Sequence, residues 1–136
     1  MNRNKMRENI MKLIYQADVH NNYIFSFFTD AYELMEDTTP VNDQYFMTVV
    51  KSFIDYKTLI DNEISNNLKK WDIDRIGKVE LAIMRLAVTE MMYLNDIPLK
   101  VSINEAIELA KVFADDQAPK YINGVLASIL KSIENA

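Results

Sequence analysis

Cysteine is absent from this 136-residue sequence, and histidine, glycine and proline are scarce. Without cysteine no disulfide can form, which fits a reducing compartment. The single histidine, His20, excludes metal clusters built from histidine and triads that use histidine as a base. With only 2 glycines there is no glycine-rich phosphate loop, so we expect neither an enzyme nor a cofactor or metal site.

Long apolar runs are also missing. No stretch approaches the roughly 20 residues that span a bilayer. The N-terminus begins with basic residues but lacks the apolar segment that follows them in a signal peptide. We therefore predict a cytoplasmic protein with no membrane partner, and the sequence suggests no small-molecule substrate.

The hydrophobic residues, 49% of the chain, recur mostly three or four positions apart, as they do in helices packed on a core. Because the helix breakers glycine and proline are rare, we predict an all-α fold of about seven helices. The length suits one domain over residues 1–136, or two small subdomains that share a core. The expected helices cover about 4–19, 23–35, 42–68 and 77–94, with a loop at 37–42 and two further helices after Pro98.

Local signals refine these helices. Asn42 can cap the third helix, which is either one long bent helix or two helices that meet near 55–58. Asp72 or Asp74 can cap the next helix, over 77–94. Because that helix is apolar on most sides, we expect it at the centre of the C-terminal bundle.

The last third of the chain carries the clearest helix signals. Ser102 and Glu105 have the spacing of a capping box, which predicts a helix start at Ser102. Pro119 suits the first turn of the final helix. Gly124 lies inside that helix, where glycine costs about 1 kcal/mol relative to alanine. We therefore expect a neighbouring segment to approach closely at Gly124.

Charge is distributed unevenly along the chain. The net charge is −5, but four basic residues against one acidic residue give the first twelve residues a charge of +3, which leaves −8 on the remainder. A short basic end can make a few phosphate contacts. From composition alone, an ordinary solvated helix start is the better explanation of these residues. The four basic residues are Arg3, Lys5, Arg7 and Lys12.

A second polar group lies where the final helix begins. The N-terminal amides of a helix favour an anion, and Gln117 and Lys120 lie at this junction. Tyr121 is off the apolar stripe of the helix, so it can stack on a base. The alternative is that Tyr121 is a rim aromatic that covers the core.

Two other sets of charged residues suggest catalysis or metal binding at first sight: Arg75, Arg85 and Glu90, and the pair Asp115 and Asp116. Arg85 and Glu90 are five residues apart and do not share a helix face, so we interpret them as structural ion pairs to other helices. The neighbours Asp115 and Asp116 form at most a weak cation site, and a polar loop explains them better.

The sequence also resembles a known family. Residues 101–111, VSINEAIELAK, and 121–126, YINGVL, resemble the C-terminal signature of the NusB family of bacterial transcription antitermination factors. The resemblance extends to Arg7-Glu8, to LIYQ at 13–16 and to AIMRLA at 82–87. It covers nearly the whole chain, more loosely between about 22 and 71.

This resemblance implies a fold and a function. The fold consists of two small helical bundles packed roughly perpendicular, about 1–56 and 57–136. The function is to bind boxA-type RNA of nascent, especially rRNA, transcripts together with ribosomal protein NusE. With other Nus factors, this assembly keeps RNA polymerase elongating.

The resemblance also implies two sites. The N-terminal segment (Arg3, Lys5, Arg7, Lys12) and the junction (Gln117, Lys120, Tyr121) correspond to the family's RNA-binding region. Tyr15 and Glu80 match the face that binds NusE. Val19 and Met84 follow these two residues at i, i+4 spacing, so we add them to that face, with core packing as the alternative.

Two other functions stay open. One is a NusB-like adaptor that binds a protein but no RNA, which the small number of N-terminal cations allows. The other is a module related to rRNA cytosine methyltransferases, which carry a NusB-like domain at their N-terminus. Because the sequence ends at Ala136 without a methyltransferase domain, we expect the antitermination factor.

Overall fold

The computed structural model describes residues 2–35, 40–69 and 72–136, and these residues are all helical or connecting. The all-α prediction is confirmed, and the number of helices is close to the seven expected. Within the described ranges, no helix is long and apolar enough to cross a bilayer. The elements are α1 (Arg3–His20), α2 (Phe25–Glu33), α3 (Gln44–Asn66), the 3-10 turn η1 (Ile73–Arg75), α4 (Lys78–Tyr93), α5 (Leu99–Phe113) and α6 (Ala118–Glu134).

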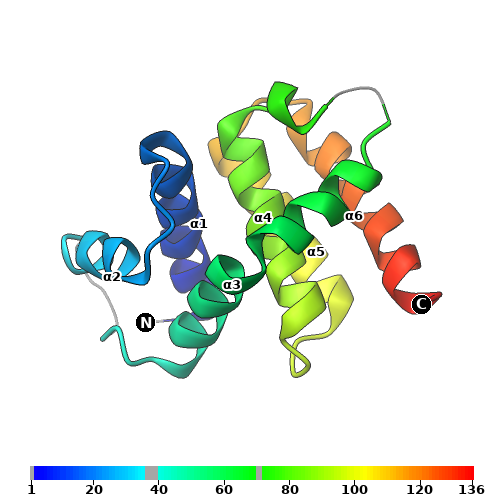
Figure 1. Cartoon of the computed structure of the whole chain (residues 1–136). Coiled ribbons are helices and arrows are strands. Elements are labelled where there is room, and N and C mark those ends of the chain that lie inside the picture. Colours follow the sequence, from blue (N-terminus) through cyan, green and yellow to red (C-terminus); the bar gives the residue numbers. More distant parts are fainter. Residues whose placement is uncertain (1, 36–39, 70–71) are drawn as a thin grey trace.

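Helix α4 lies at the centre of the fold, as its sequence predicts. Every residue from Leu81 to Met91 is buried, and α4 packs against α1, α3, α5 and α6. Figure 1 shows α3 crossing α4 from the side of α1 and α2 to the side of α6. One hydrophobic cluster runs through all six α-helices. Each large side chain that is fully buried in such a core stabilises the fold by about 1.5–3 kcal/mol.

Helix α3 is one bent helix. Its backbone leaves helical geometry at Tyr56 (φ −114°, ψ 19°), inside the 55–58 range where the sequence allowed a break. The Tyr56 ring stacks on Tyr93 of α4, with centroids 4.3 Å apart and planes at 11°. The division into subdomains near residue 56 remains a prediction.

Two helix starts differ from expectation. Asp43, not Asn42, caps α3, because its Oδ1 accepts a hydrogen bond from the Phe46 N–H at 3.0 Å. Gly77 precedes α4 without a side-chain cap, so the caps expected from Asp72 and Asp74 are wrong. The loop expected at 37–42 lies partly outside the described residues.

The C-terminal pair corrects two further expectations. Helix α5 begins at Leu99, so Ser102 lies inside its first turns and the capping box is wrong; its hydroxyl donates instead to Glu90 of α4 at 2.7 Å. Pro119 lies in the first turn of α6, as predicted. Gly124 is exposed, and no described atom outside its own helix lies within 4 Å of where a Cβ would stand. The expected close approach at Gly124 is therefore wrong.

Candidate nucleic-acid interface

Three of the four cations predicted near the N-terminus reach the surface of α1. The Arg3 guanidinium lies over the Tyr45 ring, 4.1 Å from its centroid. Lys5 and Lys12 both pair with the same Oε2 atom of Glu8, at 3.0 and 2.9 Å. Hydrogen bonds from Lys12 and Lys5 hold the pKa of Glu8 below its ordinary value, so Glu8 stays charged between them.

The fourth cation, Arg7, was predicted to bind RNA, and the structure corrects this. Arg7 is only 5% exposed, since it lies on the core side of α1. Its guanidinium donates from Nε to Glu90 Oε2 at 2.7 Å and from Nη2 to Oε1 at 3.2 Å. With both groups buried and paired, Arg7 cannot reach a phosphate at the surface.

Glu90 is the centre of a buried polar cluster. It accepts hydrogen bonds from Arg7 of α1, Tyr45 of α3 and Ser102 of α5. Burial alone would lower the pKa of Arg7, but the hydrogen bond and charge of Glu90 outweigh it and raise that pKa. Burial and the Glu90 charge raise the pKa of the Tyr45 hydroxyl, so it stays protonated and donates. The cluster joins four helices.

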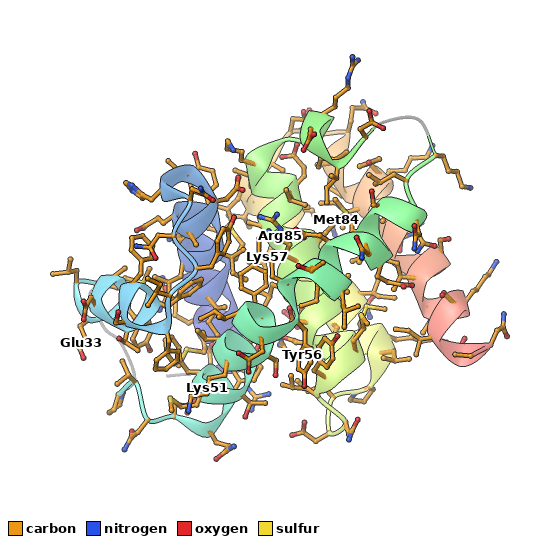
Figure 2. The ribbon with its side chains drawn as sticks, in the orientation of Figure 1. Glu33, Lys51, Tyr56, Lys57, Met84 and Arg85 are labelled. Carbon is orange, nitrogen blue, oxygen red and sulfur yellow. The ribbon has the colours of Figure 1, made fainter. Side chains whose placement is uncertain are left out.

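Arg85 forms a second cluster, near the surface between α1, α3 and α4. Its guanidinium makes two hydrogen bonds of 2.9 Å to Asp61 and one of 3.3 Å to Asp18. Lys57 also pairs with Asp61, and Lys78 with Asp18. Figure 2 shows Lys57 on α3 and Arg85 on α4. Arg85 and Glu90 therefore pair with residues of other helices and not with each other, as predicted from their spacing.

The junction before α6 is held by Asp115. Its Oδ1 accepts hydrogen bonds from the backbone N–H groups of Gln117 and Ala118, at 3.0 and 3.1 Å, so this carboxylate already occupies the start of the helix. Gln117 and Lys120 are exposed, and Tyr121 is half-buried. This geometry fits the interpretation of Asp115 as part of a polar loop.

Tyr121 lines two hollows. The first, of about 290 Å³, lies between Tyr121, Gln117, Arg75 and Glu80. The second, of about 510 Å³, is lined by Tyr121 and Gln117 together with Lys120, Lys69, Asn67 and Gly124. The Tyr121 hydroxyl is buried and has no hydrogen-bond partner among the described residues. Burial, and the charge of Glu80, raise its pKa. Arg75, Asn67 and Lys69 were not predicted here, because only the fold brings them beside Tyr121.

The structure brings one basic residue of α1 close to this junction. The Lys12 ammonium lies 5.2 Å from the centroid of Phe113, near the end of α5 and four residues before Gln117. Lys5 lies two helical turns earlier, about 10 Å along α1. The seven residues predicted to bind RNA therefore divide into three groups. Gln117, Lys120 and Tyr121 lie at the start of α6. Arg3, Lys5 and Lys12 are at the surface of α1, and Arg7 is buried.

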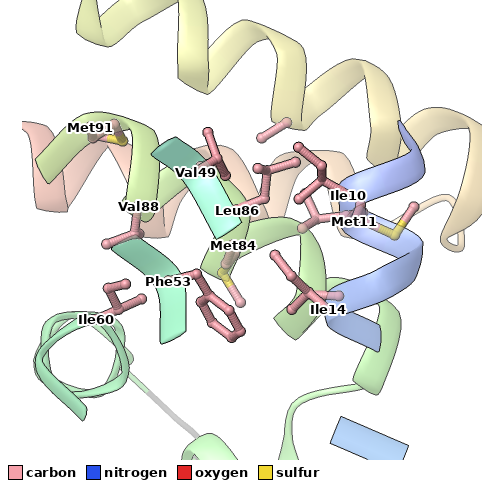
Figure 3. Packing of buried hydrophobic residues seen from close by; sticks show 14 of the residues in the cluster. Ile10, Met11, Ile14, Val49, Phe53, Ile60, Met84, Leu86, Val88 and Met91 are labelled. Atoms are coloured by element: carbon pink, nitrogen blue, oxygen red, sulfur yellow. The ribbon is translucent and has the colours of Figure 1, made fainter. Parts of the chain in front are cut away.

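The residues predicted to bind NusE divide in a similar way. Tyr15 and Val19 are 36% and 51% exposed on α1, and Glu80 is half-buried at the start of α4. Met84 is 0% exposed and packs in the core with Phe53 and Ile14 (Figure 3). The prediction that Met84 belongs to a surface interface is therefore wrong, because the neighbouring helices enclose α4 around this residue.

Exposed cations, an aromatic ring and open hollows on a helical framework are features of a protein that binds macromolecules. Within the described residues, no group of three or more histidine, cysteine, aspartate or glutamate side chains could hold a metal ion.

Comparison with known proteins gives the family. Residues 4–131 match the model of the NusB family. The transcription antitermination protein NusB of Oceanobacillus iheyensis is 43% identical, over 96% of this chain and 99% of the relative. The structure of T. maritima NusB superposes with a TM-score of 0.85 at 28% identity, covering 96% of this chain and 92% of that one. The chain belongs to the NusB family.

A second solved structure shows a family member with its partners. It is a crystal structure of the antitermination factors NusB and NusE in complex with dsRNA. Its matching chain has a TM-score of 0.84 at 27% identity, with 96% of each chain covered.

Proposed function

We propose that this protein is a transcription antitermination factor of the bacterial cytoplasm that binds boxA-type RNA together with NusE. By holding both on a nascent transcript, it promotes processive elongation by RNA polymerase, and other Nus factors join the assembly indirectly. The observation that carries this proposal is the match to antitermination proteins along nearly the whole chain. It acts by binding and not as an enzyme.

The RNA surface that we propose is centred on Tyr121. Gln117 and Lys120 line one hollow together with the ring, and Lys12 of α1 lies over Phe113, four residues before Gln117. A tyrosine face supplies stacking for an unpaired base, worth about 1–3 kcal/mol, and the ammonium groups contact phosphates. Arg3 and Lys5 extend the surface along α1. Because the net charge of the chain is negative, RNA binding would depend on these local contacts.

The NusE surface that we propose is formed by Tyr15, Val19 and Glu80. The two apolar side chains are exposed one helical turn apart, and Glu80 supplies a charged rim. The ion pair between Asp18 and Lys78, at 2.7 Å, holds the end of α1 against the start of α4. Each bound partner then adds binding area for the other, so the ternary affinity exceeds the pairwise one.

The test is fluorescence anisotropy of a labelled boxA RNA titrated with the protein, with and without NusE, at low and high salt. We expect binding that strengthens with NusE and weakens with salt. The variant Lys120→Glu should weaken binding at low salt by about five- to tenfold, because it loses a phosphate contact and adds repulsion. The control is Lys131→Glu, which makes the same charge change at the far end of α6. Equal effects of the two variants would place the RNA elsewhere.

One observation favours a second candidate, an adaptor that binds NusE but no RNA. Glu8 forms ion pairs with both Lys5 and Lys12, which reduces the positive charge available to phosphates. The same titration decides between the candidates. RNA that stays free while NusE still binds identifies the adaptor.

A further inference from the structure

Glu8 lies in the middle of the cations of α1. Lys5 and Lys12 are seven residues apart, so they share one face of the helix two turns apart, and Glu8 lies between them. Both ammonium groups converge on a single carboxylate oxygen, Glu8 Oε2, at 3.0 and 2.9 Å. The two lysine side chains remain about half exposed, at 45% and 43%. The pairs therefore lie at the surface, where a ligand can compete for them.

This arrangement has the geometry of an occupied anion site. Lysine ammonium groups also bind phosphate oxygens at hydrogen-bond distance, as point charges. We propose that Glu8 occupies, as an internal mimic, the position at which Lys5 and Lys12 would otherwise hold a phosphodiester group of RNA. This inference rests on the RNA-binding function proposed above, and it names Glu8 as the residue that limits the affinity of that surface.

The consequence is a competition between carboxylate and phosphate. When RNA approaches, Lys5 and Lys12 must either break their ion pairs with Glu8 or contact Glu8 and the phosphate at the same time. The negative charge of Glu8 also repels the RNA. Exposed lysine–carboxylate pairs are weak, so RNA can displace them at a modest cost. RNA binding is therefore possible with Glu8 present but weaker than the number of cations suggests.

The experiment compares Glu8→Gln with Glu134→Gln by RNA anisotropy at several salt concentrations. Both variants change the net charge equally, but Glu134 lies at the exposed end of α6. We expect Glu8→Gln to bind RNA about three- to tenfold more tightly at low salt, because two lysines become available. The slope of log affinity against log salt should also steepen by about one to two contacts. Glu134→Gln should bind like the wild type.

Lys12 provides a second arm. Lys12→Met should weaken RNA binding in the wild type, but by a smaller factor than in the Glu8→Gln background, because Glu8 competes with RNA for this lysine in the wild type. In the Glu8→Gln background the same change should remove much of the gain. Circular dichroism of each variant establishes that α1 is intact, and Glu8→Ala serves as an alternative should the glutamine variant misfold.

The outcomes separate this inference from the proposed function. If wild-type protein binds RNA and Glu8→Gln binds with the same affinity and salt slope, Glu8 does not compete and the inference is overturned. If only Glu8→Gln binds RNA, the inference holds while the proposed RNA binding of the wild type fails. If no variant binds RNA although NusE binding persists, both fail.

Discussion

Lys5 and Arg7 are two residues apart and both positively charged, yet their surroundings differ completely. Lys5 is exposed, whereas Arg7 lies on the face of α1 that carries Met6 and Ile10 into the core. A buried cation is stable only when it is paired, and Glu90 supplies that pair from the central helix. In the sequence, 83 positions separate the two partners, so spacing along the chain could not reveal the pair.

Because of this pairing, Arg7 should matter for folding and not directly for RNA binding. Arg7→Met should lower the free energy of unfolding by about 3–5 kcal/mol, since it leaves Glu90 buried without its cation. Urea denaturation monitored by circular dichroism measures this change. Lys5→Met, the control two residues away, should shift stability by less than about 1 kcal/mol. Equal stability of the two variants would contradict the structural role assigned to Arg7.

The residues predicted to bind NusE also show that spacing along the chain does not reveal the tertiary surroundings of a side chain. Val19 and Met84 were both chosen because they lie one helical turn from a residue matched to the family. Val19 is half exposed and Met84 is fully enclosed. The difference arises because α1 has one free side, whereas α4 is covered by four other helices. Helical spacing gives the direction of a side chain but not the number of neighbours around the helix.

Whole helices were predicted better than single contacts. The broad apolar surface of α4 correctly indicated a central helix, and the uninterrupted pattern of α3 correctly allowed for a bend at Tyr56. The cap of α3 was missed because the neighbours Asn42 and Asp43 are equally good caps, and the start of α5 because Pro98 precedes it without a side-chain cap. Ser102 has the spacing of a capping box, but its hydroxyl bonds to Glu90 on another helix.

The start of α3 provides a direct test of the observed cap. Asp43→Ala should lower the free energy of unfolding by about 1 kcal/mol, because the Phe46 N–H loses its acceptor. Its neighbour Asn42, the cap expected from sequence, makes the matched control, and Asn42→Ala should leave stability within about 0.5 kcal/mol. Thermal and urea unfolding of both variants measure the difference. A larger loss of stability for Asn42→Ala than for Asp43→Ala would identify Asn42 as the cap.

The fold as a whole is held by two ionic clusters of different depth. The Glu90 cluster is buried and joins α1, α3, α4 and α5, while the Arg85 cluster is nearer the surface and joins α1, α3 and α4. In the second cluster, burial alone would raise the pKa of Asp18. Hydrogen bonds and charge from Lys78 and Arg85 outweigh burial, so the pKa lies below its ordinary value.

This lowered pKa makes stability depend on pH in the acid range. The unfolded chain takes up a proton on Asp18 at a higher pH than the folded chain does. The contribution of Asp18 is therefore complete above its ordinary pKa of about 4 and is lost as pH falls through the lowered value. Urea unfolding at about pH 7, 5 and 3 should show Asp18→Asn less stable at neutral pH and less sensitive to acid. Asp30→Asn, on the surface of α2, controls for net charge, and an unchanged acid profile for Asp18→Asn would contradict this account.

Gly124 combines two features of practical use. No described atom outside its helix lies within 4 Å of where its side chain would begin, and it borders the larger hollow beside Tyr121. The chain contains no cysteine, so Gly124→Cys would introduce a single thiol. A dye attached there would stand on the rim of the proposed RNA surface without displacing core residues. The vacant position thus offers an attachment point from which the arrival of RNA can be followed by fluorescence in real time.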